Sequence, residues 1–284
     1  MRKRDQVMLC YPYEEKRFLQ WGSKAIIQPK LDGDRCIAKV GQEVNLYSST
    51  GILITSVSHI NKELKSIIGN CEGVELDGEI YCHGMIHSKI SGLVRTKWGA
   101  PEEGKNLQYH IFDIPTYKDI RYEKRIDTLP AFCSQHQSKI IKVISHNTVS
   151  TIDDIFLHLK EYISQGYEGF VLKHPMSIYE RKRSINWMKF KPRKNDLYLI
   201  LGSIEEYSIH NEPKGQLGAL ILIGIDETNR FTSQQFKVGT GFTCKQRKEL
   251  WKAKESLTGK LCSIKYQELS KDSIPREPVF IEIL

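Results

Sequence analysis

The chain has 284 residues, of which 40% are hydrophobic, and it carries a formal net charge of +8. This length and hydrophobic content exclude global disorder and suit two folded domains, while the longest apolar run, residues 217–225, is too short to cross a bilayer. Seven scattered cysteines without a C-x-x-C pair argue against a zinc site and a disulfide framework, and the N-terminus lacks an apolar signal core, so we expect a reducing, cytoplasmic setting.

Strand patterns dominate residues 1–193. Apolar and β-branched runs on either side of an Asp-Gly turn predict strands at residues 24–30 and 35–40. Runs of the same kind predict further strands at residues 43–48, 73–81, 107–114 and 169–173.

Two segments of this part show a helical period instead. Residues 58–70 carry apolar side chains three and four positions apart, and Ser58 is expected to cap this helix. Residues 151–166 predict a second amphipathic helix. Its buried side is expected to carry Ile155, Leu157, Leu159, Tyr162 and Ile163.

The pattern changes near residue 193 to short strands and glycine turns. Five strands and one helix in the remaining span suit a small OB-like barrel. The sequence therefore predicts one domain over residues 1–193 and a second over residues 194–284, with a single continuous α+β domain as the alternative. The five strands are expected at residues 197–207, 218–225, 234–242, 260–269 and 278–284, and the helix at residues 243–259.

The net charge is uneven along the chain. Residues 194–284 hold 13 basic and 12 acidic side chains, so an excess of +7 lies in residues 1–193. Such an excess favours a polyanionic partner such as nucleic acid, although an ordinary basic enzyme surface would show it equally.

The stretch QPKLDGDRC, residues 28–36, places Lys30 two residues before an Asp-Gly turn and five before Arg35. A lysine amine attacks only when it is neutral, and partial burial and nearby cations lower its pKa toward that state. Lys189 and Lys191 alternate on a predicted strand, so both can project into one pocket, where a triphosphate would offset their repulsion. The alternative is an exposed polar loop.

Carboxylates accompany these cations. Glu79 lies on a predicted strand, and Glu168 lies at the entry of another. With Asp32 they are candidate oxygen ligands for Mg²⁺, with substrate phosphates completing the shell. Phe112 is a candidate platform for a base, although a lone phenylalanine is more often a core residue.

The order of these segments is informative. KLDGDR, LDGEIY, HIFDI, EGFVLK and WMKFKP follow one another along the chain, and FKVGTGFT, YQEL and REPVF come later. In this order the chain resembles the minimal ATP-dependent DNA ligases of viruses and phages, which belong to the covalent nucleotidyltransferase superfamily. The first five segments are similar to that family's motifs I, III, IIIa, IV and V, and the later three to strands of its OB domain.

The resemblance implies an α+β fold. A nucleotidyltransferase (adenylation) domain of antiparallel sheets with helices would occupy residues 1–193, and an OB-fold β-barrel would occupy residues 194–284. It also implies an ATP- and Mg²⁺-dependent DNA ligase, acting as a monomer without a membrane. Such an enzyme seals 3′-OH/5′-phosphate nicks in duplex DNA through lysine-AMP and DNA-adenylate intermediates, as in repair and replication.

The resemblance also implies roles for single residues. Lys30 would become the AMP-lysine, while Lys189 and Lys191 would hold the α-phosphate. Arg35 and Glu79 would contact the ribose and the adenylate. The adenine would be held by Phe112, through stacking, and by Gln28, at its edge. Metal binding would fall to Asp32, Glu79 and Glu168.

Three features depart from that family's pattern. Ser49 stands where the family usually has an arginine for the nick phosphate, so Arg95, Lys97 or the basic residues 181–183 are candidate substitutes. A basic and acidic motif VI is not seen after residue 280, which predicts slow self-adenylation or another basic group in its place. The stretch 203–218 is too short for the long DNA clasp of larger viral relatives.

Other functions stay open at this point. An mRNA capping guanylyltransferase or an RNA ligase of the same superfamily also uses K-x-D-G. A non-catalytic OB-type nucleic-acid-binding protein is a different class, but its basic half should then be the OB part, and here that part is nearly neutral.

Overall fold

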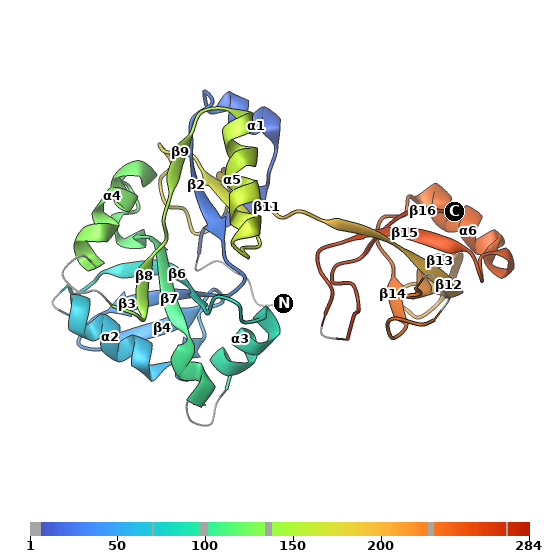
Figure 1. Ribbon diagram of the computed structural model, residues 1–284, viewed down its shortest axis with the longest axis horizontal. Helices are drawn as coiled ribbons and strands as arrows, with labels where there is room; N and C mark the ends of the chain where they lie inside the picture. Colours follow the sequence, from blue (N-terminus) through green and yellow to red (C-terminus); the bar gives the residue numbers. More distant parts are fainter. Residues whose placement is uncertain (1–6, 70, 97–101, 134–137, 227–229, 271) are drawn as a thin grey trace. The chain divides into compact units, whose positions relative to one another are not determined.

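The computed structural model describes residues 7–69, 71–96, 102–133, 138–226, 230–270 and 272–284. The chain divides into two compact units, Met1–Lys191 and Pro192–Leu284 (Figure 1). The predicted domain boundary after residue 193 lies two residues beyond this division. Among the described residues, no helix is long and apolar enough to cross a membrane.

The first unit contains a five-stranded sheet, here called the nucleophile sheet. Its strands are, in order across the sheet, β1 (Leu9–Pro12), β11 (Arg183–Phe190), β10 (Gly169–Lys173), β2 (Ala25–Lys30) and β9 (Asn147–Val149). Its central strand is β10, and the neighbouring strand β2 is buried along most of its length, with the partly buried Lys30 at its end.

A six-stranded sheet, here called the second sheet, completes this unit. Its pairings and those of the nucleophile sheet are antiparallel as predicted, except that β1 pairs with β11 and β7 with β8 in parallel, so the sheets are mixed. Its strands are, in order, β5 (Leu53–Ile54), β4 (Val44–Ser48), β3 (Asp34–Val40), β6 (Glu75–Tyr81), β7 (Gln108–Asp113) and β8 (Ile141–Val143).

Helices α1 (Glu15–Gln20) and α5 (Ile152–Ser164) cover one face of the nucleophile sheet. Thr151 caps α5 through a reciprocal pair of hydrogen bonds with Asp154. The predicted buried side of α5 is too wide: Ile155 and Tyr162 are buried, but Leu157 and Ile163 are 66% and 41% exposed. The sheet therefore contacts a narrower stripe of this helix than its apolar pattern indicates.

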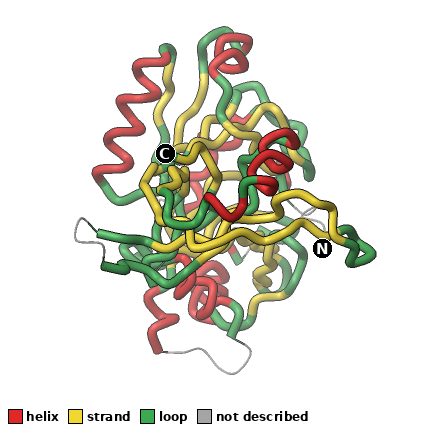
Figure 2. Tube along the Cα trace, turned by 90° about the vertical axis from the view of Figure 1, so that its right-hand side faces the viewer, coloured by secondary structure: helices red, strands yellow, loops and turns green. Residues whose placement is uncertain are grey.

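Helices α2 (Ser58–Ile68), α3 (His87–Val94) and α4 (Tyr122–Cys133) pack around the second sheet. Short 3-10 turns lie at η1 (Glu102–Asn106), η2 (Pro115–Tyr117) and η3 (Lys254–Ser256). The prediction that Ser58 caps α2 is wrong, because Val57 holds the cap position and no side chain caps it. Figure 2 shows the helices flanking the strands.

The second unit confirms the predicted five strands and one helix, α6 (Cys244–Lys252). The amide of Phe280 donates to the carbonyl of Thr240 at 2.9 Å, so the last strand approaches the end of β14 and the sheet curls, as in an OB-like barrel. The strand order is β14 (Phe236–Val238), β13 (Pro213–Ile223), β12 (Lys194–Tyr207), β15 (Leu261–Tyr266) and β16 (Val279–Ile283).

Candidate active site

Lys30 and Glu168 meet where β2 ends and β10 begins. Lys30 lies opposite Gly169 in the antiparallel register, and the amide of Glu168 donates to the carbonyl of Lys30 at 3.1 Å. The Glu168 carboxylate accepts a hydrogen bond from Lys30 Nζ through one oxygen and pairs with Lys191 Nζ through the other. Three predicted site residues are therefore in direct contact. A carboxylate of the protein therefore lies between these two lysines.

One face of the nucleophile sheet collects the other predicted residues. Residues that face each other on antiparallel strands point to the same side of the sheet. Gln28 and Lys189 both lie opposite Val171, so they share a face, and Lys30 follows on that face two residues after Gln28. Lys189 is exposed at the end of β11. The predicted proximity of Lys189 to the amine is thus consistent with the strand register.

Steric crowding explains why two positions of the motifs are glycine. A Cβ on Gly33 would lie 2.3 Å from the carbonyl oxygen of Ile80 and 2.8 Å from Cγ of Glu79. A Cβ on Gly169 would lie 2.0 Å from the carbonyl oxygen of Phe190, and its φ of +154° also disfavours a side chain. These close approaches fix the loop after Lys30 against β6 and fix β10 against β11.

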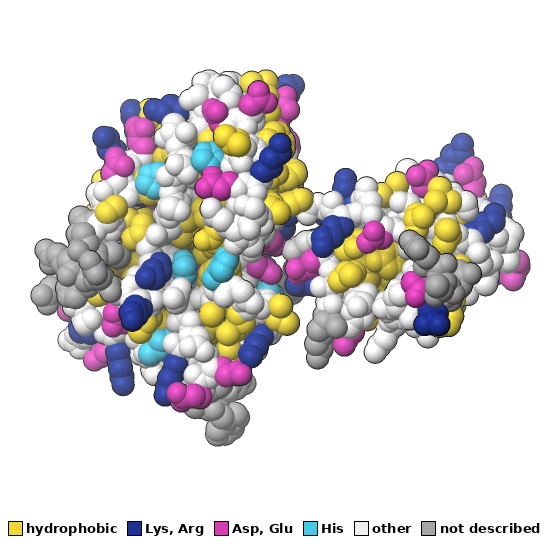
Figure 3. Space-filling view, in the orientation of Figure 1, with side chains coloured by type: hydrophobic (Ala, Val, Ile, Leu, Met, Phe, Trp, Pro, Cys, Tyr) yellow, Lys and Arg dark blue, Asp and Glu magenta, His cyan; other side chains and the backbone are white. Residues whose placement is uncertain are grey.

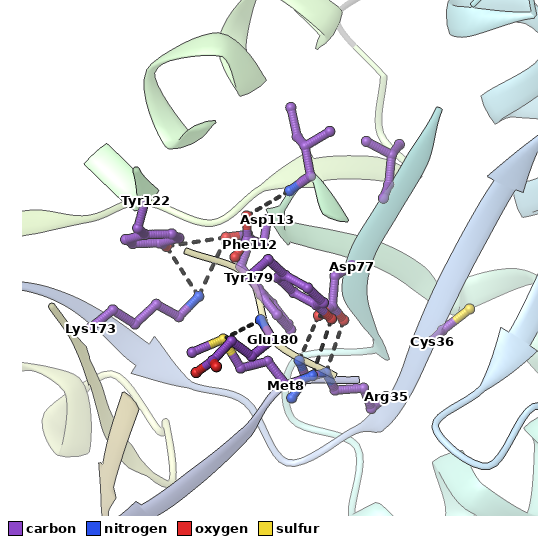
Figure 4. Close-up of polar contacts among 12 residues, drawn as sticks. Met8, Arg35, Cys36, Asp77, Phe112, Asp113, Tyr122, Lys173, Tyr179 and Glu180 are labelled. Carbon is purple, nitrogen blue, oxygen red and sulfur yellow. Dashed lines mark hydrogen bonds and ion pairs between the residues drawn. The ribbon is translucent and has the colours of Figure 1, made fainter. Parts of the chain in front are cut away.

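Arg35 is held by Asp77 rather than by Glu79. Its Nε and Nη2 donate to the two carboxylate oxygens of Asp77 at 2.9 and 2.5 Å, and Tyr179 donates to the same carboxylate at 2.5 Å (Figure 4). Burial favours the neutral guanidinium, but the Asp77 charge outweighs it and raises the pKa of Arg35 above its ordinary value. Asp77, which the sequence alone did not single out, is therefore a candidate residue for positioning Arg35.

Glu79 lies opposite Arg35 on β6 and is partly buried. Burial raises the pKa of its carboxyl group to about 7, and the positive charges of Lys30 and Arg35 only partly offset this effect. The side chain makes no hydrogen bond among the residues that the structure describes. Asp32, Glu79 and Glu168 do not gather into a three-carboxylate metal cluster within that same part of the chain.

Lys173 is a further candidate site residue, which the sequence alone did not single out. It is 2% exposed, and its Nζ lies 4.0 Å from the ring centre of Trp187, 4.4 Å from that of Phe112 and 4.5 Å from that of Tyr122. Its Nζ also donates to the Tyr122 hydroxyl at 3.1 Å (Figure 4). Burial lowers the pKa of Lys173 to about 7. A charged residue at an inward position of an apolar strand was the available signal.

Gln28 reaches the same aromatic group. Its Oε1 accepts a hydrogen bond from the Tyr122 hydroxyl at 3.0 Å, and the side chain is 2% exposed. Its Nε2 is buried and finds no hydrogen-bond partner among the described residues. Buried donors are normally satisfied, so this amide is suited to an acceptor on a ligand. Phe112 is buried at 9% exposure, with the guanidinium of Arg35 4.9 Å from its ring centre.

The residues that were candidates to replace the missing arginine lie in different parts of the first unit. Ser49 lies in the turn after β4. Arg95 follows α3 and pairs with Asp34 at 3.8 Å, whereas Arg181 pairs with Glu75 at the start of β6. Lys97 lies outside the described residues. On the face drawn in Figure 3, lysine and arginine side chains of the first unit are interspersed with acidic ones.

Both parts of the chain match known protein families. The family described as "ATP dependent DNA ligase domain" matches residues 7–191, which hold all of these side chains. The family described as "DNA ligase OB-like domain" matches residues 211–283.

Individual relatives agree. The DNA ligase of Haemophilus influenzae is 23% identical over 274 residues, covering 95% of this chain and 89% of that protein. The DNA ligase of African swine fever virus is 25% identical over 286 residues, and the match covers 93% of this chain but 66% of the viral protein. A solved structure from a study of Lig E DNA ligases as a minimal DNA-binding scaffold superposes with a TM-score of 0.74 at 20% identity, covering 98% of both chains.

Proposed function

The chain belongs to the ATP-dependent DNA ligase family, and from that premise we propose that it seals 3′-OH/5′-phosphate nicks in duplex DNA. Family membership confirms the resemblance read from the motifs. The observation that carries the proposal is the contact of Lys30 and Lys191 with one Glu168 carboxylate, on the sheet face that also presents Gln28.

Lys30 is the proposed nucleophile toward ATP. The ammonium first loses one proton, the neutral Nζ then forms a bond to the α-phosphorus while the bond to pyrophosphate breaks, and a second proton leaves the nitrogen to the departing pyrophosphate or water. Glu168 already accepts a hydrogen bond from this amine, so its carboxylate is placed to receive the first proton. Once Glu168 is neutral, Lys191 is released from its ion pair and can hold the α-phosphate. Positioning and charge neutralisation supply most of the catalysis in such transfers.

The base and the ribose have separate contacts. The free Nε2 of Gln28 and the buried Lys173 offer donors for ring nitrogens of adenine. Phe112 remains the proposed stacking residue, and the ion pair with Asp77 orients Arg35 toward the ribose side. A purine pocket with these donors would select ATP by hydrogen bonding.

Two further transfers complete the reaction. A 5′-phosphate oxygen at the nick attacks the phosphorus bound to Lys30, and AMP moves to the DNA as that nitrogen–phosphorus bond breaks. The 3′-hydroxyl then attacks the 5′-phosphorus and AMP leaves. Action as a monomer and an intracellular setting stay predictions.

Family membership implies the use of ATP; Mg²⁺ is part of the proposal. Asp32 and Glu79 fit such an ion, because Mg²⁺ binds through one or two carboxylates and substrate phosphates, and Glu79 lacks a hydrogen bond among the described residues. Glu168 fits less well while it pairs with two lysines. Bound there, the ion would neutralise charge on the phosphates.

A capping guanylyltransferase is not favoured, because the matching families and the similar proteins are DNA ligases. Intact-mass measurement after incubation with ATP or GTP tests this point. We expect one added AMP from ATP, its loss in Lys30→Ala, and its retention in the control Lys24→Ala, which removes an exposed lysine just before the same strand. AMP on the Lys30→Ala protein would reject the mechanism. Sealing of nicked DNA but not nicked RNA separates a DNA ligase from an RNA ligase.

A further inference from the structure

A group of donors surrounds Asp34, four residues after the nucleophile. Ser91 Oγ lies 3.0 and 3.3 Å from the two carboxylate oxygens, His87 Nε2 lies 3.5 Å from one of them, and Arg95 Nη2 lies 3.8 Å from the same oxygen. All three donors come from α3 and the residue that follows it. A carboxylate and a phosphate oxygen accept the same donors, so this arrangement is one that suits a phosphate.

The group is placed beside the catalytic loop. Asp34 begins β3 and lies opposite Ile80, whose carbonyl oxygen the Gly33 backbone approaches. Helix α3 packs against β3 and β6, the strands that carry Arg35 and Glu79. The donors on α3 are therefore fixed to the same strands as the adenylation residues.

Arg95 is the most exposed member of this group. Its side chain is 75% exposed, whereas that of Asp34 is 17% exposed. At 3.8 Å the pair is a weak surface ion pair, which a stronger anion can replace at little cost. Ser56 Oγ donates to the Val94 carbonyl at 2.7 Å, so the segment that follows the Ser49 turn is bonded to the residue before Arg95.

We propose that Arg95, positioned by Asp34 on the α3 surface, binds a phosphate group of the substrate, the 5′-phosphate of the nick in the first instance. This inference rests on the proposed ligase function and assigns one of its substrate contacts. Residues 48–52, Ser-Ser-Thr-Gly-Ile, bring no cation of their own. The phosphates of ATP are the other source of the same chemistry.

The test compares Arg95→Ala with Arg121→Ala, which removes an exposed arginine of the same unit just before α4. Binding is measured, without ATP, to nicked duplexes that carry a 5′-phosphate or a 5′-hydroxyl. One charge-assisted contact is worth about a ten- to hundredfold change in affinity. We expect Arg95→Ala to lose about that much for the 5′-phosphate nick and little for the 5′-hydroxyl nick, with partial rescue by Arg95→Lys and no loss in Arg121→Ala.

Self-adenylation at varied ATP concentration distinguishes the two sources. An unchanged ATP dependence in Arg95→Ala assigns the contact to the nick, and a raised ATP requirement with unchanged nick binding assigns it to the nucleotide. Equal loss for both nicks, or no loss in either assay, overturns the proposal. Failure of the unsubstituted protein to form lysine-AMP or to seal a nick would instead reject the ligase function, so the two failures are distinguishable.

Discussion

Lys173→Met gives the sharpest quantitative test of the buried lysine. The unfolded chain keeps Lys173 protonated up to a pKa of 10.5, whereas burial lowers the pKa to about 7 in the folded protein. Between these values the unfolded state binds more protons, so the free energy of unfolding rises with pH by about 1.4 kcal/mol per unit. From pH 7, where the folded lysine is half protonated, to pH 9 this contribution integrates to about 2 kcal/mol.

Methionine has a similar length and no charge, so it removes this contribution and keeps the packing among the aromatic rings. Urea unfolding of both proteins at pH 7 and pH 9, followed by fluorescence of Trp187 and the other tryptophans, measures the difference in slope. We expect the unsubstituted protein to gain about 2 kcal/mol more than Lys173→Met over this range. The control Lys39→Met, at a 46% exposed side chain on β3, should show the unsubstituted slope. Equal slopes for Lys173→Met and the unsubstituted protein would refute the lowered pKa.

Three other substitutions test the geometry of the site. Gly169→Ala places a Cβ 2.0 Å from the Phe190 carbonyl oxygen, so thermal melting should show that the free energy of unfolding falls by about 2–3 kcal/mol. The control Gly73→Ala has a positive φ but open space around it, and its loss should be clearly smaller. Equal losses in the two variants would contradict the steric argument. Glu168→Gln keeps the shape but removes the charge and the proton acceptor, and single-turnover self-adenylation should slow by about a hundredfold or more. An unchanged rate would remove Glu168 from the mechanism. Phe112→Ala should lower stability by about 3–5 kcal/mol and raise the ATP requirement. A loss of stability with unchanged ATP dependence would make Phe112 a core residue only.

Most strands of both units could be predicted from the sequence because their apolar runs are short and bounded by turns. The strands β1, β5, β8 and β9, of two to four residues, were not predicted, because runs this short show no clear alternation. The helix surfaces could not be predicted as well, since the width of the buried side depends on the packing partner. Leu157 and Ile163 belong to the apolar pattern of α5, but both side chains are exposed and lie outside its contact with the sheet. The predicted cap of α2 was wrong by one residue: Ser58 is the first residue of the helix, and Val57 holds the cap position.

The site shows the same division. The K-x-D-G stretch and its later motifs indicated candidate residues for the chemistry, because each residue type suits a role in nucleotide transfer. The ion-pair partner of Arg35 could not be predicted from the sequence, since Asp77 and Glu79 lie two residues apart on the same strand and either could pair with it. Only the folded register gives Asp77 the bidentate contact and leaves Glu79 with a raised pKa. The aromatic surroundings of Lys173 could not be predicted either, because its three rings come from three separate elements of the chain.

These contacts share one electrostatic feature. Three cations proposed to meet a phosphate are held by carboxylates of the protein: Lys30 and Lys191 by Glu168, and Arg95 by Asp34. Internal pairing keeps the positive side chains oriented while no polyanion is bound, and it limits their mutual repulsion. It also means that a substrate phosphate has to compete with a carboxylate for each of these three cations. A triphosphate or a DNA end, which presents several charges at once, can displace these carboxylates where a single small anion would not.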